Sequence, residues 1–298
     1  MNDERVVVSG GSGLIGSELM RSLRDDGRRA VRLVRRPART PDEVEWHPGE
    51  RALDPTALAG ASAVVNLNGA SIGRLPWTRG YRRVLRESRL LPTRALASAI
   101  RELGAEAPKL VSASAVGFYG DRPGEPLTEA AGPGATFLAE LCADWEEEAL
   151  AAGPRARTAL IRTAPLLHPR GVLKPMIRLT RWGLGGPLGG GAQIWPWISL
   201  DDEVRAIRHV LDRDLTGPVN LAGPVPASAN EIGRALAREL HRPFALPAPA
   251  WALRLGLGRD AAESLLLADA AVAPAALTAS GFSFAHGTAG EAVEAAMR

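Results

Sequence analysis

The chain has 298 residues, a length that suits one large domain with a smaller one appended. Hydrophobic residues make up 46% and charged residues 23%, as in ordinary soluble proteins, and the net charge of +3 is too small and too dispersed to indicate a nucleic-acid partner. A single cysteine excludes an internal disulfide, and we see neither a signal peptide nor an apolar run of membrane-spanning length, so we expect a cytoplasmic protein with no membrane span.

The N-terminal stretch predicts a strand, a glycine-rich turn and a helix. Residues 6–8 are all valine, a β-branched run typical of a buried strand. Hydrophobic residues from Leu14 to Leu23 then recur at helical spacing. Glycines at such a turn let backbone N–H groups approach a pyrophosphate and let the helix pack close to the strand. The turn residues that we assign to a dinucleotide cofactor are Gly10, Gly11, Ser12, Gly13, Leu14, Ile15 and Gly16.

The residues after the second strand select the cofactor. Residues 30–34 predict this strand and complete a βαβ unit of the expected length. NAD sites usually place Asp or Glu after it, to bond the ribose 2′-OH. This chain has Arg35 and Arg36 instead, and guanidinium groups suit a 2′-phosphate. We therefore expect NADP(H), although in an arginine-rich chain these two residues can also be solvent-exposed surface charges.

Two further strands place loops at the predicted cofactor edge. Residues 44–46 predict a short third strand; the loop after it passes under the adenine in dinucleotide folds, although Trp46 can equally be a packed residue. Residues 63–70 predict a fourth strand and its turn, which should meet the cofactor because ligands lie beyond the carboxyl ends of parallel strands. The residues that these loops contribute are Trp46, His47, Asn68, Gly69 and Ala70.

The rest of the chain continues the alternation and then changes. Helices are predicted over 81–103 and 136–152, and strands over 109–114 and 158–162. The glycine-rich segment 183–191 predicts a loop, and a later helix is expected to be capped near Asp201.

These elements indicate an α/β fold, a Rossmann-type doubly wound parallel sheet with a smaller, mostly helical C-terminal lobe. We expect residues 1–165 to form the NADP(H)-binding domain, with 198–222 returning to it. Residues 166–197 and 223–298 are expected to form the substrate-binding lobe.

These motifs resemble the extended short-chain dehydrogenases/reductases, in the atypical subgroup labelled nucleoside-diphosphate-sugar epimerase-like. The resemblance runs nearly from end to end, and it implies a sugar-nucleotide-epimerase fold, although most members have no established substrate. The matching segments are 10–16, 66–69, Ser88-Arg89 with Thr93, 112–120, Trp145-Glu146, 183–187, Trp197-Ile198 with Asp201-Asp202, and Gly281-Phe282.

The catalytic pair of the superfamily is missing from this chain. The resemblance implies a Tyr-x-x-x-Lys motif on the helix after strand five, in which the tyrosine exchanges a proton with substrate while hydride moves to or from the nicotinamide. Ser114 matches the serine of strand five, but Leu138 stands at the tyrosine place and Cys142 at the lysine place. Arg89 replaces the helix asparagine. Ordinary alcohol dehydrogenation and C4 epimerisation are therefore in doubt.

Four residues are candidates for the altered chemistry. Ser114 can polarise a substrate oxygen or nitrogen, and Tyr119 is the nearest possible proton donor unless it packs in its turn. Arg89 stays protonated and can bind a phosphate, a carboxylate or the nicotinamide ribose region. Cys142 can be a weak acid or nucleophile, or simply a small core residue. The histidines show no metal-ligand spacing, so no metal is expected.

Three classes of function fit these observations. The first is an NADP(H)-dependent oxidoreductase or epimerase-like enzyme that acts on a small organic substrate through non-standard residues. The second is a non-redox cyclase or isomerase on the same scaffold, and the third is an NADP(H)-binding sensor without catalysis. The intact glycine turn and the arginine pair favour the first over the second, whereas the missing Tyr-Lys pair favours the third.

The oligomeric state depends on the two predicted helices over 81–103 and 136–152, through which extended members often dimerise. The outward face of the first helix carries four arginines, which suit solvent better than a like-charged copy of the same helix. We therefore expect a monomer rather than a homodimer. These arginines are Arg82, Arg83, Arg86 and Arg101.

Overall fold

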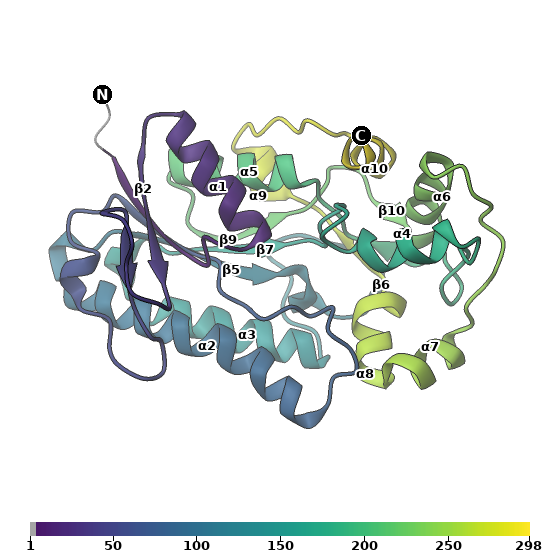
Figure 1. The fold of residues 1–298 in the computed structure, drawn as a ribbon, viewed down its shortest axis with the longest axis horizontal. Coiled ribbons are helices and arrows are strands. Elements are labelled where there is room, and N and C mark those ends of the chain that lie inside the picture. The colour runs from purple at the N-terminus through teal and green to yellow at the C-terminus, as the bar shows by residue number, and fades with distance from the viewer. Residues whose placement is uncertain (1–3) are drawn as a thin grey trace.

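A seven-stranded parallel sheet runs through the middle of the protein (Figure 1). The computed structural model describes residues 4–298. The strand order is β3-β2-β1-β4-β5-β7-β9, so the direction of winding reverses between β1 and β4. The strands are β1 (Arg5–Ser9), β2 (Arg29–Val34), β3 (Glu43–Glu45), β4 (Ala63–Asn66), β5 (Lys109–Ala115), β7 (Ala159–Thr163) and β9 (Gly217–Leu221).

Helices cover both faces of this sheet, which confirms the predicted doubly wound fold. The helices α1 (Leu14–Asp25) and α5 (Leu200–Asp212) lie on one face, and α2 (Arg79–Glu102) and α3 (Phe137–Leu150) lie on the other (Figure 1). In β1, Val6 and Val8 pack on the α1 side and Val7 packs on the α2 side. Strands that are buried on both faces are continuously apolar, which is why this run of valines predicts its own position.

Hydroxyl side chains fix where three of these helices begin. Thr78 accepts a hydrogen bond from the backbone of Tyr81, and Thr136 does the same for Ala139. The helix α5 is capped by Ser199, which accepts from the Asp202 backbone N–H. The prediction of a cap near Asp201 was therefore two residues late.

A second core belongs to the C-terminal part of the chain. Trp195, Trp197 and Leu173 pack there against α6 and α10, away from the sheet. The surrounding elements are α4 (Leu173–Arg181), β8 (Ile194–Trp195), β10 (Ala227–Ser228), α6 (Ala229–Glu239), α7 (Ala250–Leu257), α8 (Arg259–Ala262) and α10 (Ala289–Met297). Short helical turns lie at Pro55–Ala57, Gly104–Glu106, Val116–Tyr119, Pro154–Ala156 and Glu263–Leu267.

One part of the predicted lobe packs on the main sheet instead. The strand β11 (Ala270–Val272) pairs with β6 (Arg122–Leu127), and α9 (Ala275–Ala279) follows it. Ala270, Val272 and Leu277 are buried in the same core as β7 and β9. These apolar side chains tie the C-terminal segment to the sheet, so the lobe predicted over 223–298 is interrupted here.

Among residues 4–298, no helix has both the length and the apolar character that crossing a membrane requires.

Candidate functional site

The glycine turn lies at the carboxyl end of β1. Gly10 has a φ of 77°, and a Cβ there would lie 2.6 Å from the Leu67 carbonyl oxygen. A Cβ on Gly16 would lie 2.4 Å from the Gly10 carbonyl oxygen, so α1 packs directly on the turn. Both positions therefore require glycine. No side chain of the described residues caps α1 at Gly13, so its first backbone N–H groups remain available to an anion.

The two arginines that follow β2 differ in their surroundings. Arg36 donates to both carboxylate oxygens of Glu43, at 2.8 and 2.6 Å. These bonds from Arg36 lower the pKa of Glu43 to about 2. Arg35 is exposed and makes no ion pair within residues 4–298. Of the predicted pair, Arg35 is thus the one whose charge is free for a ligand.

A third arginine, Arg32, lies closer to the glycine turn than either of these. Its Cγ and Nε each lie 3.2 Å from the position that a Cβ on Gly11 would occupy. The Nε atom is buried and has no hydrogen-bond partner in the part of the chain that the structure describes. The sequence signal for this residue was a single charge inside the apolar run of β2.

The two residues predicted for the adenine loop are engaged elsewhere. Trp46 is buried in the core on the α2 side of the sheet, so the packed alternative is the one observed. The His47 ring nitrogen Nε2 lies 2.9 Å from Glu45 Oε1. Among residues 4–298, neither side chain makes a hydrogen bond or an ion pair to the glycine turn.

The turn after β4 lies against the glycine turn. Gly10 approaches Leu67 and Asn68 through the backbone, and the Asn68 side chain bonds Asn66 and Ser9. The backbone N–H of Ala70 donates to Ser88 Oγ at 2.9 Å. The predicted cofactor residues 68–70 are therefore held rigidly beside the carboxyl end of β1.

Arg89 closes the same turn from α2. Its guanidinium donates to the carbonyl oxygens of Leu85 and Ala70, at 3.0 and 3.1 Å. It also lies over the Trp145 ring, 5.2 Å from the ring centroid. A Cβ on Gly69 would lie only 3.1 Å from its Cζ atom. Burial lowers the pKa of Arg89 from its ordinary value.

Ser114, at the end of β5, belongs to a buried polar network. Its hydroxyl donates to Glu146 Oε1 at 2.7 Å. The guanidinium of Arg162 donates to both oxygens of Glu146, at 2.8 and 2.9 Å. It also donates to the Tyr119 hydroxyl at 2.9 Å, and this hydroxyl donates to Asn220 Oδ1 at 2.6 Å. The network joins β5, α3, β7 and β9 beneath the carboxyl edge of the sheet.

This arrangement does not favour the predicted roles of Tyr119 and Cys142. The Tyr119 ring is fully buried, and its hydroxyl proton is taken by Asn220. Burial raises the pKa of Tyr119 and also raises the pKa of Cys142 to about 12. Tyr119 therefore has no proton free for a substrate, and Cys142 is a neutral thiol packed in the core.

Sequence reasoning gave no role to three members of the network, Glu146, Arg162 and Asn220. Arg162 is the one charge in the otherwise apolar β7, whereas Glu146 stands in an acidic stretch of α3, and both are nearly inaccessible to solvent. Buried charges are normally paired, so a lone charge such as Arg162 is a signal for a buried partner. The sequence could not show that Glu146 and Arg162 form a pair across α3 and β7.

A family model described as NAD dependent epimerase/dehydratase family matches residues 6–222. The chain belongs to the NAD-dependent epimerase/dehydratase family. This membership confirms the resemblance to extended short-chain dehydrogenases/reductases. A second model, for a domain of unknown function, matches residues 248–296.

Individual members of this family are similar over their full length. Epimerase family protein MT2273 of Mycobacterium tuberculosis is 41% identical over 291 residues, which cover 97% of this chain and 96% of the relative. Epimerase family protein SDR39U1 of Bos taurus is 30% identical, covering 97% of this chain and 98% of the relative. The crystal structure of human epimerase family protein SDR39U1 (isoform2) with NADPH has a TM-score of 0.87 and 27% identity, covering 98% and 99% of the two chains.

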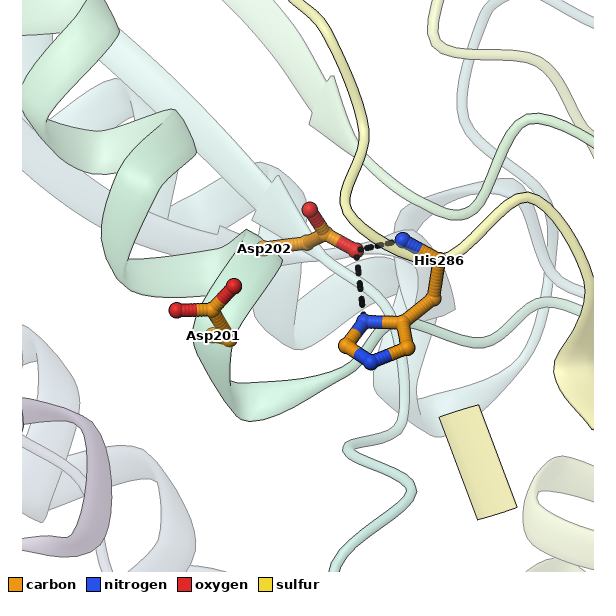
Figure 2. Close-up of side chains that lie close together, drawn as sticks. All are labelled: Asp201, Asp202 and His286. Atoms are coloured by element: carbon orange, nitrogen blue, oxygen red, sulfur yellow. Dashed lines mark hydrogen bonds and ion pairs between the residues drawn. The ribbon is translucent and has the colours of Figure 1, made fainter. Parts of the chain in front are cut away.

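One further cluster lies near the start of α5 in this family member. Figure 2 shows Asp202 facing His286, with Asp201 beside them on α5, and ligand atoms of the three side chains lie within 4.8 Å of one another. The Asp202 oxygens accept from the backbone N–H groups of Ala285 and His286 at 2.7 and 3.2 Å, and from Ser199 Oγ at 3.0 Å. Protein donors thus surround this carboxylate, which anchors the C-terminal segment on α5.

Proposed function

We propose that the protein is an NADP(H)-dependent enzyme, an oxidoreductase or epimerase-like catalyst that acts on a small organic substrate. The observation that carries the proposal is the glycine turn, whose two tightest positions admit no Cβ and which adjoins the buried, unpartnered Nε of Arg32. The human relative crystallised with NADPH supports the same cofactor.

The described residues fit such a cofactor at both ends of the turn. Backbone N–H groups at the start of α1 would hold the pyrophosphate. Arg32 and Arg35 would hold the 2′-phosphate, while Arg36 is kept at the edge of β3 by Glu43. Residues 68–70 would lie beside the nicotinamide half. The nicotinamide supplies or accepts hydride when it is bound.

The hydrogen bonding of Ser114 limits which substrate groups this side chain can bind. Because its own proton goes to Glu146 Oε1, Ser114 Oγ offers only lone pairs. It would therefore accept a hydrogen bond from a substrate hydroxyl or amine, rather than donate one to a carbonyl. Arg162 would hold the Glu146 carboxylate in place through two hydrogen bonds, which keeps the Ser114 hydroxyl in this orientation.

Calorimetric titration tests the cofactor assignment directly. Charge-assisted contacts to a 2′-phosphate contribute about 1.5–3 kcal/mol, so NADPH should bind at least about tenfold more tightly than NADH. Equal affinities for the two would refute the proposal.

A non-catalytic NADP(H) sensor is the second candidate. Tyr119 and Cys142 are both buried, and among the described residues neither offers a proton at the carboxyl edge of β5. A spectrophotometric screen of NADPH consumption over carbonyl, imine and enone compounds separates the two. Turnover of any compound supports the enzyme, whereas tight NADPH binding without turnover supports the sensor.

A further inference from the structure

The guanidinium of Arg89 carries a charge that no acidic side chain neutralises within residues 4–298. Its hydrogen bonds go only to the backbone oxygens of Leu85 and Ala70. Arg162 is the other arginine at this end of the sheet, and its Nε and Nη2 atoms donate to the two carboxylate oxygens of Glu146. Arg162 is buried and Arg89 is partly buried, and of the two only Arg162 is bonded to an anion.

Even partial burial of a charge without a charged partner is unfavourable, and an arginine does not avoid this by losing its proton. Proteins normally pair such groups or replace them with apolar ones. Arg89 is nevertheless fixed in place by two carbonyl oxygens, the Trp145 ring and the close approach of Gly69. A rigid, unneutralised cation of this kind is prepared for an anion that the protein does not itself supply.

The position of Arg89 indicates which ligand brings that anion. In the doubly wound fold the ligand lies across the reversal between β1 and β4, beyond the carboxyl ends of the strands. The adenosine end would lie at Arg32 and Arg35, beyond β2. Arg89 lies on the other side of this reversal. It bonds the turn after β4 and lies close to Cys142, and Cys142 in turn lies close to Ser114. Arg89 therefore faces the half of the site that holds the nicotinamide and the substrate.

We propose that Arg89 is the oxyanion-binding residue of this site, receiving a negatively charged oxygen of the bound ligand. The inference rests on the proposed NADP(H) function. Two sources have the required chemistry, namely the cofactor phosphate on the nicotinamide side and a carboxylate or phosphate of the substrate. The free N–H donors of a fixed guanidinium match either one.

The first arm of the test uses cofactor fragments. NADPH and adenosine 2′,5′-bisphosphate, which lacks the nicotinamide half, are titrated calorimetrically into wild type, Arg89→Gln and Arg89→Lys. If the cofactor is the source, Arg89→Gln weakens NADPH binding at least about tenfold and leaves the bisphosphate unchanged. Arg89→Lys keeps the charge and should lie between wild type and Arg89→Gln. Arg94→Gln is the matched control on α2, since Arg94 is exposed and bonds Glu148.

The second arm uses substrate-like anions. The NADPH-loaded proteins are melted with a panel of oxo acids and phosphate monoesters, and with their neutral esters. If the substrate is the source, NADPH affinity is unchanged in Arg89→Gln, and charged probes raise the melting temperature of wild type but not of this variant. Neutral esters should raise neither.

Three outcomes decide between the proposals. The inference is overturned if Arg89→Gln matches wild type with NADPH and with every charged probe. It is also overturned if the variant binds the bisphosphate as poorly as NADPH, because that marks a general loss of structure. Should Arg89→Gln fail to fold, Arg89→Lys alone must show the weakening. A wild type that binds neither NADPH nor the bisphosphate refutes the proposed function itself.

Discussion

Glu203, on α5, is a buried acid that the proposed chemistry does not use. Its Oε1 accepts a hydrogen bond from Thr163 at 2.8 Å, and its Oε2 has no partner among the described residues. Burial raises the pKa of Glu203 from 4.5 to about 8. The folded protein therefore keeps the proton over a pH range in which the unfolded chain loses it.

This difference makes stability fall as pH rises. Between about pH 4.5 and 8 the folded state holds one more proton at Glu203 than the unfolded state, which costs up to about 1.4 kcal/mol per pH unit. The variant Glu203→Gln keeps the shape and the bond to Thr163 but cannot ionise. Its melting temperature should exceed that of wild type by a margin that grows from pH 5 to pH 8. Parallel melting curves across that range would contradict the raised pKa.

Mutations of Ser114 and Tyr119 are expected to affect different properties, turnover in the first case and stability in the second. Tyr119→Phe removes bonds to Arg162 and Asn220 inside the core, so it should cost about 1–3 kcal/mol of stability without altering NADPH affinity. Ser114→Ala removes the proposed contact to the reacting substrate group, so it should lower turnover by about 10²–10⁴-fold. Denaturant unfolding measures the first effect, and kinetics on any substrate from the NADPH screen measure the second. A large kinetic loss in Tyr119→Phe, with stability intact, would restore it as the proton donor.

The buried ion pair gives a third prediction at this scale. Glu146→Gln leaves the Arg162 guanidinium buried without its carboxylate, which typically costs about 3–5 kcal/mol. The double variant Glu146→Gln with Arg162→Met should recover much of that loss, because it removes the stranded charge. Urea unfolding of the single and double variants tests this coupling, and additive losses would argue against it.

At the scale of elements, the turn between β1 and α1 gives the sharpest steric prediction. Gly16→Ala would bring a methyl group to 2.4 Å from the Gly10 carbonyl oxygen, so α1 must move away from the turn. NADPH binding should fall by at least tenfold, as measured by calorimetry. Gly132→Ala is the matched control, because a Cβ there meets nothing within 4 Å. Unchanged NADPH binding in Gly16→Ala would mean that this turn does not carry the cofactor.

The strands of the protein differ in how far the sequence alone predicts them. The strands β1, β2, β4, β5 and β7 were foreseen because each is a short apolar run next to a helical pattern, a signal contained within the segment itself. The strand β6 was not foreseen, since Arg122–Leu127 includes two prolines and is mostly exposed. Its partner β11 lies far along the chain, so the pairing depends on tertiary packing alone.

The residues of the candidate site also differ in how far the sequence alone predicts their roles. The glycine turn is a local feature, and its place at the carboxyl edge follows from the fold. The roles of Tyr119 and Arg36 were open, because each depends on a partner elsewhere, Asn220 in one case and Glu43 in the other. A side chain's availability is a property of its neighbours, and one sequence does not place those neighbours.

At the scale of the whole molecule, the outward face of α2 bears on the oligomeric state. Three of its arginines pair with acids of the same chain, Arg82 with Asp260, Arg83 with Glu87, and Arg86 with Asp144. Repulsion between copies is therefore weaker than the sequence suggested. Burying these pairs in a dimer would still remove their solvation, and dimer cores are depleted in charged residues.

We therefore predict a monomer of 31.5 kDa in solution. The same ion pairs make the prediction testable with salt, because screening weakens exposed pairs and leaves apolar contacts intact. Light scattering over a range of protein concentrations, at low and at high salt, should give the monomer mass throughout. A dimer mass that persists on dilution and at high salt would show that an apolar surface other than this charged face joins two copies.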